Sequence, residues 1–169
     1  MLEGSSSMRL SRRGALRLLA LTPAAMFVSL SSVAYAQSSS ETTPPDGAPL
    51  ARIGVDERDP TFRLTYIHSV TRTPVDEVYR VEGLRIVETE IRFDQHGPGL
   101  PTAPDAGGTF EHRDGKFVAR VNRTFDTIVM RVHADQQPAL IAGAQSLDLA
   151  RWGNRALALT AHAGTCAAP

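Results

Sequence analysis

The sequence predicts an all-β fold, either a small antiparallel β-sandwich or a small barrel. Three observations support this prediction. After residue 50, apolar and polar residues alternate with a period of two along most segments. Short runs of this kind follow one another at near-regular spacing, as in sandwiches and barrels. No stretch shows the apolar period of a helix several turns long, although residues 139–152 offer room for a short one.

Residues 1–36 have the pattern of a cleaved export signal. Arginines precede a short apolar run at 18–30, and the residues A-Y-A at 34–36 form an A-x-A cleavage site. The run falls short of the roughly 20 apolar residues that a membrane span needs. The arginine pair within 11–17 resembles a twin-arginine signal, and the general secretory route is the alternative. The sequence therefore predicts a periplasmic protein that either route exports.

Residues 37–50 are rich in serine, threonine and proline, and we expect a disordered linker there. Removal of the leader takes away four arginines and one glutamate, so the mature chain carries a net charge of −3 at pH 7. An acidic surface argues against nucleic acid as a partner, because nucleic acid is bound by basic patches. The single cysteine, Cys166, allows no intrachain disulfide and no multi-cysteine zinc site.

The single all-β domain is predicted over residues 51–166. Its expected strands are 62–66, 78–84, 84–93, 110–113, 116–121, 127–133, 139–142, 147–149 and 155–162. The apolar face changes phase inside 84–93, which predicts a β-bulge. Asp114-Gly115 lies between two alternating runs and favours a type I′ hairpin turn. The glycines and prolines of 94–108 predict a loop.

Two polar segments contain the chemistry-capable residues of the domain. One spans Tyr66–Tyr79, and the other is the loop His96–Pro101. We expect these two segments to converge in space and to form the rim of a binding site. The candidate binding residues are His68, Ser69, Thr73, Glu77, Tyr79, His96, Gly97 and Gly99.

Several roles are open for His68. A structural histidine, bonded to a carboxylate such as Glu77 or to the backbone, is the commonest case. A pH-sensitive or metal-binding histidine is a second possibility. Activation of Ser69 as a nucleophile is a third, although neighbours on a strand point to opposite faces and no G-x-S-x-G motif is present. A metal site formed by His68, Glu77, His96 and His112 would lack the usual close spacing of ligands. We predict no cofactor.

Two further features suggest anion binding. The segment Gly97-Pro98-Gly99 offers backbone amides to an anion, but Pro98 has no N–H to donate, so a turn with positive φ is favoured. Arg80, Arg123 and Arg131 are candidates for a bidentate contact with an organic carboxylate.

The motifs H-S-V-x-x-T-P-V-x-E-x-Y-x-V at 68–81 and G-x-G-L-P at 97–101 resemble the bacterial family catalogued as domain of unknown function 1850. The resemblance covers roughly residues 51–166. It implies a small exported protein, often encoded beside tripartite TRAP-type transporters, with no established activity. This chain departs from the family pattern at His96 and Pro98, where small residues are more usual, so no role of His96 follows from the resemblance.

These observations lead to three hypotheses of function. The first is an accessory or binding module of a TRAP-type solute transporter, which contacts its periplasmic solute receptor, its membrane subunits or a small organic acid. The second is a small periplasmic hydrolase or metal-dependent enzyme that uses His68, Ser69 and Glu77. The third is a purely structural interaction domain.

Overall fold

The computed structural model describes residues 25–32 and 49–164. The described strands are β1 (Ala25–Ser32), β2 (Ala51–Val55), β3 (Thr61–Ile67), β4 (Pro74–Glu82), β5 (Arg85–Phe93), β6 (Thr109–Arg113), β7 (Lys116–Phe125), β8 (Ile128–Arg131), β9 (Ala139–Ala142), β10 (Gln145–Asp148) and β11 (Ala156–Gly164). Two single 3-10 turns, η1 (Ala134–Gln136) and η2 (Ala150–Trp152), complete the described elements. Residues 139–152, which offered room for a short helix, contain only the single turn η2 as a helical element.

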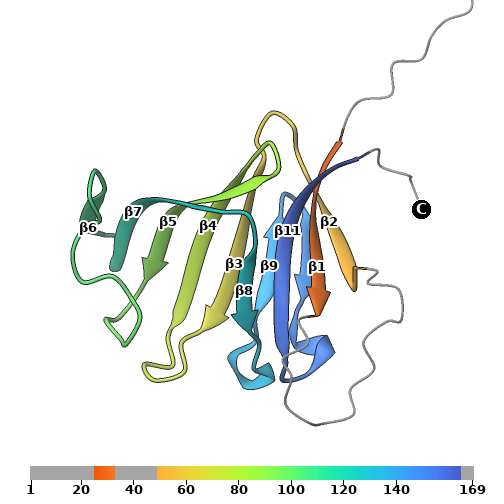
Figure 1. The fold of residues 1–169 in the computed structure, drawn as a ribbon. Helices are drawn as coiled ribbons and strands as arrows, with labels where there is room; N and C mark the ends of the chain where they lie inside the picture. The colour runs from red at the N-terminus through yellow and green to blue at the C-terminus, as the bar shows by residue number, and fades with distance from the viewer. Residues whose placement is uncertain (1–24, 33–48, 165–169) are drawn as a thin grey trace, which may run out of the picture.

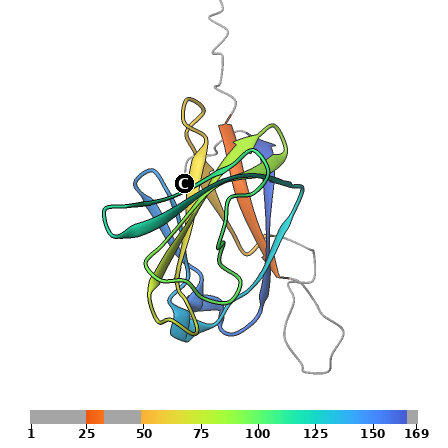
Figure 2. The same ribbon diagram turned by 90° about the vertical axis from the view of Figure 1, so that its left-hand side faces the viewer.

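The strands form two antiparallel sheets that pack as a sandwich, which confirms the predicted fold class (Figure 1). Sheet A has the order β2-β1-β11-β8, and sheet B has the order β10-β9-β3-β4-β5-β7-β6. Figure 2 shows the chain crossing from one layer to the other between β7 and β8. Sheet B is the wider of the two, so part of it extends beyond sheet A (Figure 1).

Alternation along each strand separates an inner face, turned toward sheet A, from an outer face. The main core lies between the sheets and joins Phe62 and Leu64 of β3 to Leu157 and Leu159 of β11. A second apolar cluster covers the part of sheet B that extends past sheet A. It contains Val75, Ile91, Phe93, Leu100, Ala119 and Val121. Polar residues of the inner face lie between these two clusters.

The bulge predicted inside residues 84–93 is confirmed. The register between β5 and β7 shifts between Glu88 and Glu90, and the register between β4 and β5 shifts next to Val78. Relative to β4, Thr89 is the extra residue of β5, and its hydroxyl donates to the carbonyl oxygen of Val78 at 3.1 Å. Because the bulge changes the phase of β5, Glu88 takes an inner-face position.

The predicted hairpin at Asp114-Gly115 is also confirmed. It joins β6 to β7, and both turn residues have positive φ, 54° at Asp114 and 78° at Gly115. A type I′ turn needs positive φ at both central positions, which aspartate tolerates and glycine adopts without strain. The loop predicted over 94–108 is confirmed as well, since no strand or helix lies between β5 and β6.

Strand β1 lies inside the segment that the sequence predicts as an export signal. It occupies a central position in sheet A, between β2 and β11. The rest of that segment, most of the predicted linker and Cys166 lie outside the described residues. Cleavage after residue 36 therefore stays a prediction. Among the helical elements of the described ranges, none has the length and apolarity to cross a membrane.

Candidate functional site

Two tyrosine hydroxyls hold the carboxylate of Glu77 on the inner face of sheet B. Glu77 pairs with Leu64 across the β3–β4 ladder, and Tyr66 and Tyr79 flank it on the same face. The hydroxyl of Tyr66 donates to Oε1 of Glu77 at 2.9 Å, and that of Tyr79 donates to Oε2 at 2.6 Å. Hydrogen bonds to a charged acceptor are stronger than neutral ones, so this carboxylate has a fixed orientation.

The environment keeps both tyrosines protonated. Burial raises the pKa of Tyr66 and of Tyr79 well above the ordinary value, and the negative charge and hydrogen bond of Glu77 raise the pKa further. Both phenols therefore remain protonated donors at neutral pH. The oxygen of each phenol keeps lone pairs that can accept a hydrogen bond from another group.

A second acidic group, Glu88 on β5, lies on the same face and is only 5% exposed. Nη1 of Arg123 lies 3.2 Å from Oε2 of Glu88, and Nε of Arg123 donates to Oδ2 of Asp105 at 2.8 Å. Burial raises the pKa of Glu88 to about 7, and the charge of Glu77 adds to the rise while Arg123 opposes it. The Glu88 carboxyl group therefore gains or loses its proton near neutral pH, whereas most carboxyl groups are already ionised at that pH.

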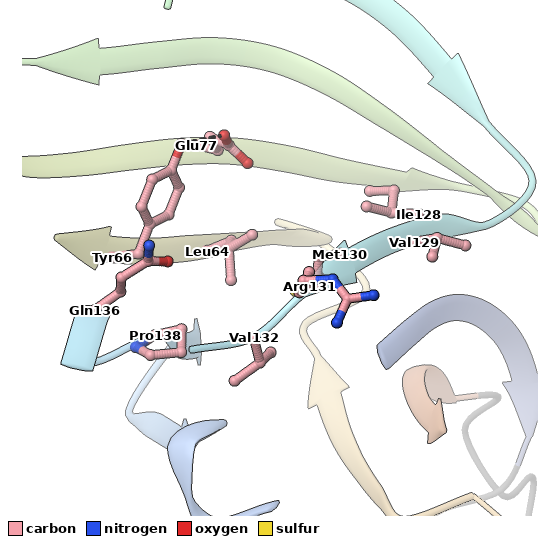
Figure 3. A pocket seen from close by; sticks show the side chains of 10 residues that line it. All are labelled: Leu64, Tyr66, Glu77, Ile128, Val129, Met130, Arg131, Val132, Gln136 and Pro138. Carbon is pink, nitrogen blue, oxygen red and sulfur yellow. Dashed lines mark hydrogen bonds between the residues drawn. The ribbon is translucent and has the colours of Figure 1, made fainter. Parts of the chain in front are cut away.

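A pocket of about 280 Å³ opens beside Tyr66 and Glu77, between strands β3 and β4 on one side and β8 on the other (Figure 3). Its apolar lining residues are Leu64, Ile128, Val129, Met130, Val132 and Pro138. Its polar lining residues are Tyr66, Glu77, Arg131 and Gln136. Apolar walls with a few polar groups are typical of small-molecule sites, and this volume suits a ligand smaller than a drug molecule.

Arg131 lies at the exposed rim of this pocket. It is the last residue of β8 and pairs with Ala156 of β11. Within residues 25–32 and 49–164, the Arg131 side chain forms no ion pair and no hydrogen bond, so its guanidinium is available to a ligand. A guanidinium presents parallel N–H donors that match the two oxygens of a carboxylate. Gln136 of η1, half-buried in the same lining, adds a carboxamide that can donate or accept.

His68 joins the two loops that the sequence predicts to converge. Its Nε2 lies 3.1 Å from the carbonyl oxygen of Pro98, and its Nδ1 accepts from the backbone N–H groups of Val70 and Thr71 at 3.2 Å each. Because Nδ1 accepts, Nε2 carries the proton and donates it to Pro98. The two loops therefore meet at His68, a buried histidine that forms hydrogen bonds with backbone groups. This arrangement agrees with the first of the roles considered for His68, that of a structural histidine.

The remaining loop candidates stabilise or border this junction. The hydroxyl of Thr73 lies 2.8 Å from that of Thr71. A Cβ added to Gly97 would lie 2.7 Å from Cε1 of His68, so only glycine fits there. Gly99 has a φ of 87°, in agreement with the turn of positive φ favoured for this segment. Ser69 is exposed and makes no hydrogen bond to His68.

His96 lies away from the pocket, on an aromatic cluster of the second apolar region. Its ring centroid lies 4.1 Å from that of Phe117 and 5.9 Å from that of Phe110. His112 contacts the same Phe117 ring at 4.7 Å. Within the described ranges, no three histidine, cysteine or acidic side chains gather as they would around a metal ion.

Of the candidate residues, only Glu77 and Tyr79 belong to the network beside the pocket. Sequence reasoning missed Tyr66 as a site residue, although its place two residues before His68 on the apolar face of the strand was a usable signal. It also missed Glu88, because the bulge decides which way this side chain points. Met130 and Gln136 lie more than 50 residues from Glu77 in sequence, and no local pattern connects them to it.

Comparison with known proteins returns one family. The family model described as domain of unknown function (DUF1850) matches residues 62–149, which include all the pocket residues. No curated protein matches the chain, and no solved structure does.

Proposed function

The chain belongs to the DUF1850 family, and from this premise we propose that it is an exported binding module that takes a small organic acid in the pocket between β3, β4 and β8. The observation that carries the proposal is the combination of groups at this pocket. An available guanidinium, Arg131, lies at the rim, and the Tyr66–Glu77 pair lies inside. Apolar side chains separate these two polar regions and offer a surface for a carbon chain.

The charges define the ligand further. Arg131 favours a carboxylate at the rim, because its side chain has no ionic partner among the described residues. Glu77 disfavours a second carboxylate inside, because two like charges at short range in a partly buried site repel strongly. A hydroxyl or ammonium group, by contrast, donates to Glu77 or to the phenol oxygen of Tyr66. We therefore expect a small hydroxy- or amino-carboxylic acid.

The proposed context is a tripartite TRAP-type transporter. This part of the proposal derives from the resemblance of the two loop motifs to a family often encoded beside such transporters. The pocket supports it by offering a site of solute size on an exported domain. The partner would be the periplasmic solute receptor or the membrane subunits of the transporter.

The alternative of a hydrolase that uses His68, Ser69 and Glu77 has less support. Both ring nitrogens of His68 bond to backbone groups, and Glu77 is bonded to Tyr66 and Tyr79 instead of to the histidine. A histidine that activates a serine needs one ring nitrogen within hydrogen-bond reach of the hydroxyl.

The experiment that tests the proposal is a thermal-shift series on the full chain. The probes are lactate, 4-aminobutyrate and succinate at rising concentration, because a ligand that binds only the folded state raises Tm by mass action. We expect lactate or 4-aminobutyrate, each with a single carboxylate, to raise Tm more than succinate does. Arg131→Gln should abolish the shift, whereas Arg52→Gln, at an exposed arginine on β2, should leave it unchanged. Equal behaviour of the two variants, or no shift with any probe, would contradict the proposal.

A further inference from the structure

Strand β1 lies in the middle of sheet A, away from the pocket, and forms a ladder on each of its sides. All eight residues of Ala25–Ser32 pair with β11, and Met26–Leu30 also pair with β2. Both ladders are antiparallel, so β2 and β11 run parallel to each other with β1 between them. Among the described strands of sheet A, β2 pairs with β1 alone. Without β1, the backbone groups that face it on both neighbours would have no ladder partner.

Three consecutive side chains of β1, those of Val28, Ser29 and Leu30, are buried. Val28 and Leu30 are each 1% exposed and lie in the main core with Ile53 and Leu157. Ser29, which points to the other face of the sheet, is 3% exposed. Val28 and Leu30 thus fill the core on one face of the sheet, and the small Ser29 between them lies on the other face. This pattern suits a strand in the middle of a sheet that is covered on both faces.

The connection between β1 and β2 is consistent with a strand from the same chain. Leu30 near the end of β1 pairs with Ala51 at the start of β2, and the backbone N–H of Leu50 donates to the carbonyl oxygen of Leu30 at 2.8 Å. The two strand ends that the intervening segment must join therefore lie side by side. A strand from the same chain fills the position without the entropy loss of recruiting a second molecule.

We infer that the folded, exported protein keeps residues 25–32 as a permanent strand of sheet A. The segment that the sequence predicts as the apolar part of a cleaved signal is then a structural element of the domain. The folded unit accordingly includes residues 25–32, and Ala51 starts the next described strand.

The first test determines the N-terminus of the exported protein. The full chain is expressed in a bacterium with a periplasm, and the intact mass of the periplasmic or membrane-bound product is measured. We expect a product that begins at or before Ala25. A folded product that begins at Gln37 would overturn the inference.

The second test determines whether the strand stays in the sheet when the chain is cut. A protease recognition sequence is placed between residues 37 and 48 of the full chain, and the folded protein is cleaved there. We expect both fragments to elute together in native size-exclusion chromatography and to separate only in denaturant. Release of the N-terminal fragment from a remainder with unchanged Tm would overturn the inference.

A pair of substitutions in the full chain provides a matched control. Val28→Asp places a charge in the main core and should lower Tm by roughly 10 °C or more. Val70→Asp makes the same change at a side chain that is 66% exposed, and Tm should change by only a few degrees. Equal effects of the two substitutions would show that β1 is not part of the folded core.

Discussion

The hydroxyl of Tyr79 donates to the carboxylate of Glu77, two residues earlier on the same strand, at 2.6 Å. Residues two apart on a strand point to the same face, so β4 supplies both the acceptor and one of its donors. Tyr66 supplies the second donor from β3. A half-buried carboxylate that accepts two hydroxyls keeps one orientation beside the pocket, as a binding site requires.

Glu77→Gln should destabilise the domain. A glutamine has one oxygen, so one of the two tyrosine hydroxyls would face an NH₂ group, and the charge that strengthens both hydrogen bonds would be lost. We expect a loss of about 1–3 kcal/mol in the free energy of unfolding, measured by urea titration at pH 7.5. Glu82→Gln on the same strand removes an exposed ion pair with Arg80 and should cost about 0–1 kcal/mol. Equal losses would contradict the proposed role of the network.

Glu88 should make stability depend on pH near neutrality. Its pKa is about 7 in the folded state and near the ordinary glutamate value in the unfolded chain, so the folded state binds more protons between these values. The contribution of Glu88 to the free energy of unfolding is therefore fully present below the unfolded pKa. It is lost as the pH rises through about 7.

The measurement compares wild type and Glu88→Gln from pH 4 to 8.5. The stability of the wild type relative to the variant should fall by at most roughly 3 kcal/mol over this range, because a pKa difference of one unit corresponds to ~1.4 kcal/mol. The other carboxyl groups cancel in this difference. A difference that is constant with pH, or that rises with pH, would contradict the assignment.

Much of sheet B could be predicted from local patterns. The alternation of Phe62, Leu64 and Tyr66 gave the inner face of β3, and the phase change within residues 84–93 gave the bulge. The Asp114-Gly115 pair gave the β6–β7 turn. These signals are local, because each depends only on side chains and backbone preferences within one strand or turn.

The location of the pocket could not be predicted in this way. It depends on the crossing of the chain from β7 to β8, which brings Met130 beside Tyr66 and Glu77. The sequence contains no local signal for a contact over such a separation.

The strand β1 was missed for a different reason. A short apolar run behind arginines is the pattern of an export signal, and the same alternation of apolar and small residues also suits a central strand.

His68→Ala should destabilise the two-loop junction. The backbone N–H groups of Val70 and Thr71 would lose their acceptor, and the carbonyl of Pro98 would lose its donor. We expect a loss of about 2–3 kcal/mol in chemical denaturation, since buried polar groups without partners are costly. Ser69→Ala changes an exposed neighbour and should have almost no effect. If His68→Ala left the stability unchanged, the histidine would not be structural.

Gly97→Ala should have a comparable effect for a steric reason. The added Cβ would lie 2.7 Å from Cε1 of His68 and 3.0 Å from Cγ2 of Thr71, and the buried imidazole is held by hydrogen bonds. We expect a loss of about 1–3 kcal/mol, as for other overpacked sites. Gly54→Ala is the control, because its Cβ would meet Nε2 of Gln145 at an ordinary 3.6 Å. Similar stabilities of the two variants would exclude close packing at Gly97.

The most direct test of organic-acid binding in the pocket is a titration of the ¹⁵N-labelled full chain with lactate, 4-aminobutyrate and succinate, followed by ¹H–¹⁵N NMR. Binding at the proposed site should shift the backbone amide signals of Met130, Arg131 and Gln136 in a saturable way, together with those of Tyr66 and Glu77. Arg131→Gln should remove these shifts without changing the rest of the spectrum. Saturable shifts confined to the loop around His96, or no saturable shift with any of the three acids, would contradict the account.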